Sequence, residues 1–165
     1  MKRSLLTLAA VLAILGPVNA FAQSGWTSPC SAGATIDETA TGLYQVNGSA
    51  LSFRAGRIGT VTARYDVVNT AVPSVPVTPW ATLELGYMDT VGGAVTATLF
   101  QVDPCTGKTT TICTAVSLAS TAPRCVVCTF AAGTVNYLTN LYFVQVNITR
   151  AVTTLNPQAF TLRIF

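Results

Sequence analysis

Residues 142–149 read YFVQVNIT, and apolar and mostly polar side chains alternate along this stretch. The first set is Tyr142, Val144, Val146 and Ile148, and the second is Phe143, Gln145, Asn147 and Thr149. A period of two is typical of a β-strand that turns one face toward a core and the other toward water. The stretch therefore predicts a half-buried strand near the end of the chain.

The same alternation recurs at residues 61–67, 81–87 and 160–164, and no helical period is apparent after residue 22. The 26 threonines suit the solvated faces of such strands, because β-branched side chains tolerate extended backbone. These patterns predict an all-β fold: a two-layer antiparallel β-sandwich, with a jelly roll as one arrangement, of about eight to ten short strands.

Turn residues separate the predicted strands. Asn47-Gly48 predicts a hairpin between residues 43–46 and 50–53, and Gly92-Gly93 predicts one between 81–88 and 94–102. Residues 103–107, DPCTG, predict a turn into a strand at 108–118. Prolines spaced three apart at residues 73, 76 and 79 predict a stiff crossover between the two sheets rather than a strand.

The first 22 residues have the layout of a secretory signal peptide. Lys2 and Arg3 precede an apolar run at residues 5–15, and small residues follow at the expected cleavage sites. The run is shorter than the roughly 20 residues of a membrane-spanning helix, so we expect no transmembrane segment. We therefore expect cleavage after residue 22, one β-sandwich domain over 23–165, and secretion to the periplasm or the extracellular space.

Charge and composition narrow the classes of function. Without Lys2 and Arg3 the chain has seven basic and six acidic residues, a net charge of about +1. No basic patch therefore favours binding to nucleic acid. The chain has no histidine, which excludes His-based triads and His metal ligands. The sequence predicts no cofactor and no metal site.

Five cysteines in an oxidising compartment predict disulfide bonds. Cys105 lies in the turn at residues 103–107 and Cys113 follows it, which favours a bridge that closes a short loop between them. Cys30, Cys125 and Cys128 then compete for a second bridge and leave one cysteine unpaired, either buried or available to join two chains. Residues 125–128, CVVC, resemble a redox dithiol, but no helix start is apparent there to stabilise a thiolate.

Only six acidic residues are present, so carboxylate-based hydrolysis has few candidates. Asp66 and Glu84 both fall on solvated strand faces, where they either neighbour each other on one sheet as an acid/base pair or solubilise a sheet surface, with Arg64 as a cross-strand contact. Asp89 falls in a predicted turn, as do Asp37 and Glu38, and oxygen ligands this sparse do not make a strong calcium site.

Aromatic residues beside loops suggest a different class of function. Trp26 and Trp80 are the candidate ligand-contact aromatics, since exposed rings provide a platform for sugars. We expect Tyr87 and Tyr142 to be core residues, because they share the apolar face of their strands.

The leading functional hypothesis is a secreted, non-enzymatic β-sandwich that acts as an extracellular structural or interaction module. The alternative is a carbohydrate-binding module, and a small carboxylate-based hydrolase is a third. The expected partners are a glycan or another protein subunit, with self-association through strand edges or an unpaired cysteine.

Overall fold

The computed structural model describes residues 25–35, 38–70, 77–91 and 93–165, which form two antiparallel β-sheets. The six-stranded sheet contains β1 (Trp26–Pro29), β3 (Tyr44–Asn47), β4 (Ala50–Phe53), β6 (Thr82–Asp89), β9 (Ser120–Thr129) and β11 (Gln158–Ile164). The five-stranded sheet contains β2 (Ala34–Thr35), β5 (Gly59–Asp66), β7 (Gly93–Val102), β8 (Thr109–Val116) and β10 (Leu141–Arg150). Two short 3-10 helices, η1 (Cys30–Ala32) and η2 (Glu38–Gly42), lie between the early strands.

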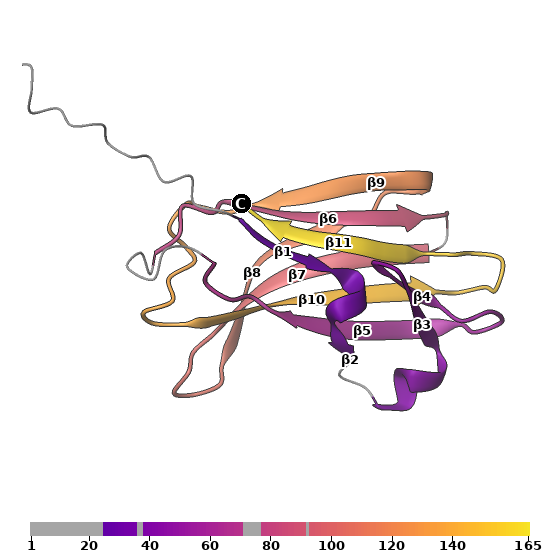
Figure 1. The fold of residues 1–165 in the computed structure, drawn as a ribbon, viewed down its shortest axis with the longest axis horizontal. Helices are drawn as coiled ribbons and strands as arrows, with labels where there is room; N and C mark the ends of the chain where they lie inside the picture. Colours follow the sequence, from indigo (N-terminus) through magenta and orange to yellow (C-terminus); the bar gives the residue numbers. More distant parts are fainter. Residues whose placement is uncertain (1–24, 36–37, 71–76, 92) are drawn as a thin grey trace, which may run out of the picture.

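The two sheets lie one on the other as the layers of a sandwich (Figure 1). Strand order is β3-β4-β11-β6-β9 in the larger sheet, with β1 also paired to β11, and β2-β5-β10-β7-β8 in the smaller one. The predicted two-layer antiparallel β-sandwich is therefore confirmed. The signal peptide predicted at residues 1–22 lies outside the described residues.

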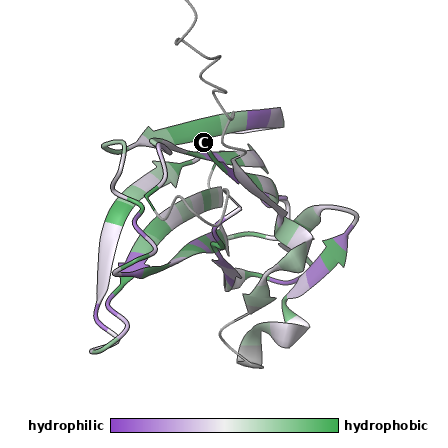
Figure 2. Cartoon of the chain, turned by 60° about the vertical axis from the view of Figure 1, so that its left-hand side comes forward, coloured by the Kyte–Doolittle hydropathy of each residue, from purple (hydrophilic) through white to green (hydrophobic). Residues whose placement is uncertain are grey.

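Strand β10 is the centre of the five-stranded sheet and has the alternation that its sequence predicts. It pairs with β5 on one side and with β7 on the other. Its even-numbered residues from Tyr142 to Ile148 are at most 4% exposed, whereas Phe143, Gln145, Asn147 and Thr149 are partly exposed. Figure 2 shows that single strands of the sandwich carry both hydrophobic and hydrophilic residues. The partly exposed residues form the outer surface of this sheet.

The core fills the space between the sheets. Its largest fully buried side chains include Trp80, Tyr87 and a set of Leu, Ile and Val residues from both layers. Tyr87 is 1% exposed and Tyr142 is 4% exposed, which confirms that both are core residues. No described helix is long and apolar enough to cross a membrane.

Two of the three predicted turns join paired strands. Asn47-Gly48 closes the β3–β4 hairpin, with Gly48 at a φ of 58°, a value that favours glycine. Residues 103–107 close the β7–β8 hairpin, with Gly107 at a φ of 69°. The hairpin predicted at Gly92-Gly93 is wrong, because β6 and β7 belong to different sheets. Residues 67–81 also lead from one sheet to the other, as predicted, although 71–76 lie outside the described residues.

The disulfide bond joins Cys113 of β8 to Cys128 of β9, so the predicted Cys105–Cys113 bridge is wrong. Cys105 lies in the hairpin turn, and Cys113 lies four residues beyond Thr109, about 13 Å along an extended strand. A disulfide needs Cα atoms within about 7 Å. Because β8 and β9 are edge strands of opposite sheets, the observed bond links the two layers at one side.

Candidate functional site

Both tryptophans predicted as ligand-contact aromatics are buried. Trp80 is 1% exposed and belongs to the core, and Trp26, in β1, is 4% exposed. Neither indole presents a ring face to solvent, so the prediction that they form a platform for sugars is wrong. The small exposed part of Trp26 lines an open pocket between β1 and β5.

The remaining cysteines do not form a reactive dithiol. Cys30 is buried, and burial raises the pKa of its thiol to about 12. Cys105 and Cys125 are exposed free thiols. Cys125 and Cys128 lie three positions apart on strand β9, so their side chains point to opposite faces of the sheet. The CVVC segment therefore does not bring its two sulfur atoms together.

The carboxylates are scattered over the molecule. Asp66 lies on β5 and Glu84 on β6, which are strands of different sheets, so the predicted neighbourhood of the two on one sheet is wrong. Glu84 instead forms an ion pair with Arg163 at 3.3 Å. The described residues contain no group of three or more His, Cys, Asp or Glu side chains that could hold a metal ion.

Asp89 lies in a strand and not in the turn where the sequence predicts it. It ends strand β6, is 3% exposed, and accepts a 2.6 Å hydrogen bond from the Ser117 hydroxyl. Asp37 and the side chain of Glu38 lie outside the described residues.

The outer face of the five-stranded sheet carries neutral hydrogen-bonding side chains across four strands, and we call it the polar face. It consists of Thr60 and Thr62 of β5, Gln145, Asn147 and Thr149 of β10, Thr96 and Thr98 of β7, and Thr114 of β8. Neighbouring strands lie about 4.8 Å apart, so these groups form rows across the sheet. The described residues build only two layers, and none of the described strands packs over this face (Figure 1).

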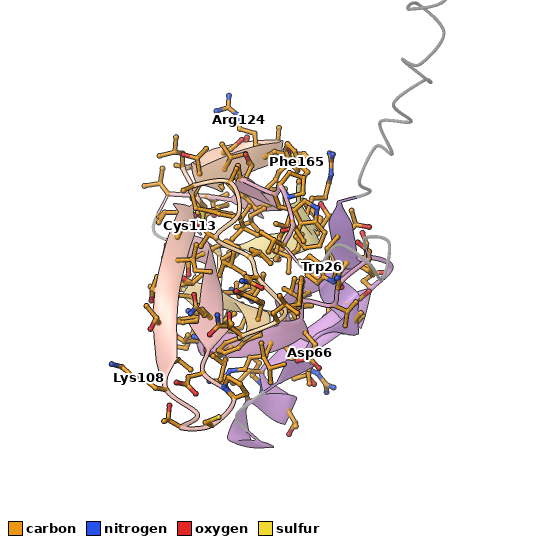
Figure 3. All side chains as sticks on the ribbon, turned by 90° about the vertical axis from the view of Figure 1, so that its left-hand side faces the viewer. Trp26, Asp66, Lys108, Cys113, Arg124 and Phe165 are labelled. Atoms are coloured by element: carbon orange, nitrogen blue, oxygen red, sulfur yellow. A yellow bond between two sulfur atoms is a disulfide. The ribbon has the colours of Figure 1, made fainter. Side chains whose placement is uncertain are left out.

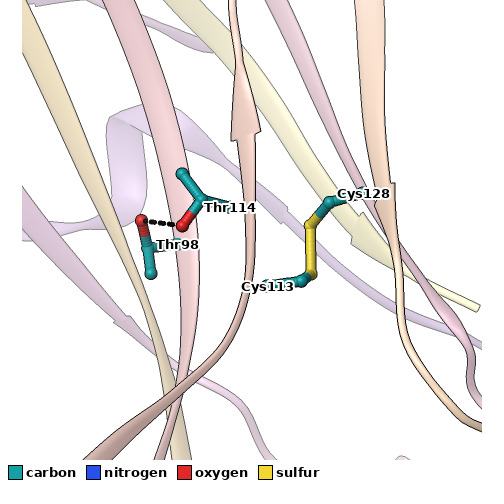
Figure 4. Close-up of a disulfide and its surroundings, with 4 residues drawn as sticks. All are labelled: Thr98, Cys113, Thr114 and Cys128. Carbon is teal, nitrogen blue, oxygen red and sulfur yellow. Dashed lines mark hydrogen bonds between the residues drawn. A yellow bond between two sulfur atoms is a disulfide. The ribbon is translucent and has the colours of Figure 1, made fainter.

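Hydrogen bonds fix the side chains of the polar face in rows. The Thr62 hydroxyl donates to Asn147 Oδ1 at 2.8 Å. The hydroxyls of Thr98 and Thr114 lie 3.1 Å apart on adjacent strands. Figure 4 shows that Thr114 points away from the disulfide side of β8, toward Thr98. These contacts connect the side chains of neighbouring strands across the face.

Two phenylalanines continue the polar face at one end. Phe143 and Phe100 are cross-strand partners, and their rings stack with centroids 5.0 Å apart and planes 20° apart. The guanidinium of Arg64 lies over the Phe143 ring, 4.7 Å from its centroid, and its Nε donates to Gln145 Oε1 at 3.4 Å. Both faces of the Phe143 ring are thus in contact with protein groups, so this ring offers an edge rather than a flat platform.

An open pocket of about 350 Å³ adjoins this end of the polar face. Its lining comes from β1, the segment 32–34 and β5, and includes Thr27, Ser28, Ala34, Arg64 and Asp66. Among the described residues, β2 pairs with β5 at Ala63 and Arg64, so no described strand pairs with this edge of β5 beyond Arg64, beside the pocket.

Sequence patterns indicated the outward residues of each strand separately, but not the surface that they build together. The alternation at residues 142–149 already places Gln145 and Asn147 toward water. Their partners Arg64 and Thr62 lie 81 and 85 positions away in the chain, and only the sheet register brings them together.

Comparisons with known proteins assign no family to this chain. No family model and no curated protein matches the chain. A family 36 carbohydrate-binding module solved with calcium and xylotriose covers 85% of this chain and 99% of its own, with 8% identity and a TM-score of 0.48. A family 36 module of a multidomain xylanase from the hindgut metagenome of Trinervitermes trinervoides covers 86% and 97%, with 13% identity and a TM-score of 0.47.

A family 15 xylan-binding module is a third similar structure, at 17% identity and a TM-score of 0.41, covering 86% of this chain and 96% of its own. Likeness at this level shows no family. It assigns no ligand to this chain.

Proposed function

We propose that this protein is a secreted, non-enzymatic binding module that holds a neutral polysaccharide on the polar face. The observation that carries the proposal is the chemistry of that face. Threonine hydroxyls and the amides of Gln145 and Asn147 both donate and accept hydrogen bonds, as the hydroxyl groups of a sugar chain do. Such a surface matches a ligand with many hydroxyl groups and little charge.

The shape and charge of the polar face support the same class of ligand. Rows of side chains across four strands give an extended, repeating surface, which suits a polymer better than a compact small molecule. The polar face itself is uncharged, and Arg64 and Asp66 are the only charged residues at the other outward positions of the described strands β5, β7, β8 and β10. Little electrostatic attraction to nucleic acid or to acidic surfaces is therefore available. The inter-sheet disulfide supports a role outside the reducing cytosol.

Retention on neutral polysaccharides tests the proposal. We expect the purified chain to be retained on at least one of microcrystalline cellulose, xylan, β-1,3-glucan and galactan. The double variant Gln145→Ala/Asn147→Ala should lower the affinity about ten-fold, because each lost hydrogen bond contributes about 0.5–1.5 kcal/mol. Thr121→Ala/Thr129→Ala removes two exposed hydroxyls of β9 in the other sheet and should have no effect.

Two results would contradict the proposal. The first is the absence of retention on all four polymers. The second is an equal loss of retention in the two double variants, which would place binding away from the polar face. Circular dichroism melting of each variant checks that the sheets are intact.

A structural role through self-association is a second candidate, and strand β9 carries it. Among the described strands β9 pairs only with β6, so its other edge offers backbone hydrogen-bonding groups, and Cys125 on this strand is an exposed thiol. If β9 joins two copies, gel filtration will show a dimer or polymer whose covalent form disappears in reductant and in Cys125→Ser. A monomer at high concentration without reductant argues against this role.

A further inference from the structure

Each sheet carries one arginine on its outer face with a ring beneath the guanidinium. In the six-stranded sheet, Arg163 faces Glu84 across the β11–β6 pair, and its Nη1 lies 3.3 Å from Glu84 Oε1. Its Cζ lies 4.8 Å from the centroid of the Phe165 ring. This guanidinium therefore has both an aromatic support and a carboxylate partner.

The corresponding arginine of the five-stranded sheet lacks the carboxylate. Arg64 faces Gln145 across the β5–β10 pair, and its Cζ lies 4.7 Å from the centroid of the Phe143 ring. The residue that faces Arg64 is thus an amide, where Glu84 supplies a carboxylate to Arg163. Nε of Arg64 donates to the Gln145 oxygen, and no acceptor among the described residues pairs with its terminal amino groups.

No carboxylate of the described residues forms an ion pair with Arg64. Asp66 is two positions further along the same face of β5, about 7 Å away along an extended strand. Arg163 therefore has a carboxylate partner, whereas the charge of Arg64 has none among the described residues.

The open pocket of about 350 Å³ lies next to this guanidinium. Pockets of roughly 300 Å³ and more accommodate small organic ligands. Thr27 and Ser28 from β1 add hydroxyl groups to the lining, and Asp66 adds an acceptor. Trp26 of the six-stranded sheet and Asp66 of the five-stranded sheet both line the pocket, and Figure 3 shows them on the same side of the molecule. The pocket is open to solvent beside the polar face, where a side branch of a bound polymer would project.

We propose that Arg64 binds the carboxylate of an acidic sugar branch on an otherwise neutral polysaccharide, and that this branch occupies the pocket between β1 and β5. The inference rests on the proposed function, since the polymer backbone would lie on the polar face. The planar guanidinium fork matches a carboxylate with two parallel hydrogen bonds. The Phe143 ring and Gln145 hold the fork in place, which lowers the conformational entropy lost on binding.

The charges around Arg64 favour isolated carboxylates over a continuous polyanion. Asp66 is the nearest charged neighbour on this face and also lines the pocket, so it weakens the attraction of Arg64 for one carboxylate and repels a second one close to it. The rest of the polar face is neutral and offers no cation to further acidic units. A polymer with one acid on every sugar therefore binds less well than one with sparse acidic branches.

Matched pairs of polymers test the inference by affinity electrophoresis. One pair is 4-O-methylglucuronoxylan and the same polymer after reduction of its carboxyl groups, and a second is lightly carboxymethylated cellulose and hydroxyethyl cellulose. Polygalacturonate represents the continuous polyanion. Two variants remove the proposed contact: Arg64→Gln removes the guanidinium, and Gln145→Glu supplies Arg64 with an internal carboxylate as in the Glu84–Arg163 pair. Arg163→Gln is the matched control in the other sheet.

We expect the unmodified chain to bind the sparsely acidic member of at least one pair about five-fold more tightly than its neutral partner, the range of an exposed ion pair. The acid-to-neutral ratio should fall to about one in Arg64→Gln and Gln145→Glu, and should persist in Arg163→Gln. At about 1 M salt the ratio should also approach one, because the Debye length is then only about 3 Å.

The outcomes separate this inference from the proposed function. Equal affinity for the acidic and neutral members, with no change in Arg64→Gln, overturns the role of Arg64 and leaves neutral polysaccharide binding in place. Tightest binding to polygalacturonate overturns the preference for sparse acids. Absence of binding to every polymer, including the four neutral ones above, overturns both.

Discussion

Neighbouring atoms leave no room for a side chain at Gly33, although its backbone conformation would allow one. Its φ of −72° suits any residue, but a Cβ atom there would lie 2.3 Å from Cζ of Tyr65. That ring is held because the Tyr65 hydroxyl donates a 2.6 Å hydrogen bond to the Cys30 carbonyl. We expect Gly33→Ala to lower the free energy of unfolding by about 1–3 kcal/mol in urea denaturation.

Gly42→Ala is the control for this change, since a Cβ atom at Gly42 meets nothing within 4 Å. It should alter the free energy of unfolding by no more than about 0.5 kcal/mol. Similar losses in the two variants would show that the contact with Tyr65 does not decide the cost.

Cys30 is the least reactive of the free cysteines. Burial raises the pKa of its thiol to about 12, and the thiolate is the form that reacts with alkylating agents. Iodoacetamide at about pH 8 should therefore modify Cys105 and Cys125 in the native protein and spare Cys30, with all three modified in urea. Peptide mass spectrometry reads the result, and modification of native Cys30 as fast as Cys105 would refute the prediction.

At the scale of elements, the Cys113–Cys128 bond connects edge strands that belong to different sheets. It closes a segment of 15 residues, for which the chain-entropy model gives about 3 kcal/mol of stabilisation. Cys113→Ser/Cys128→Ser should lose about this free energy of unfolding, measured by denaturant titration. Cys105→Ser, at an exposed turn position, should stay within about 0.5 kcal/mol. An equal loss in both would mean that the inter-sheet bond contributes nothing specific.

Asp103 stabilises the turn between β7 and β8 through its carboxylate. Backbone N–H groups of Cys105, the larger contribution, and of Thr106 donate to Asp103 Oδ1 and hold the pKa of this carboxyl below its ordinary value of 3.8. The stabilisation is therefore complete above the ordinary pKa and is lost as pH falls through the lower pKa of the folded state. In an NMR titration the Cys105 amide should shift with a midpoint below 3.8, and Asp103→Asn should abolish the shift.

Strand positions were predictable from the sequence because the period of two is a local property. The alternation in YFVQVNIT gives β10 and its buried face directly. Pairing is not local: Gly92-Gly93 reads as a hairpin turn, yet β6 and β7 enter different sheets. The cysteine pairing failed for the same reason, since Cys113 and Cys128 meet only when two sheet edges are stacked.

At the scale of the whole molecule, the candidate site was less predictable than the fold. Tryptophan beside a loop is compatible with a surface platform, but packing of the two layers buries Trp80 and nearly all of Trp26. The polar face depends on the register of strands far apart in the chain, which places Arg64 opposite Gln145. No short-range pattern contains that information.

The low net charge of the molecule leads to a prediction about salt. The full chain has a net charge of +3, and removal of Lys2 and Arg3 brings this to about +1. Contacts to a neutral polymer on the polar face are hydrogen bonds and van der Waals contacts, which salt screens little. Affinity for a neutral polysaccharide should therefore change less than about two-fold between 50 mM and 1 M NaCl, whereas a protein that neutralises 6–10 phosphates loses about 10³–10⁵-fold between 50 and 200 mM. A steep loss of neutral-polymer binding in salt, or retention of double-stranded DNA at physiological salt, would show that charge rather than the hydroxyl and amide rows drives recognition.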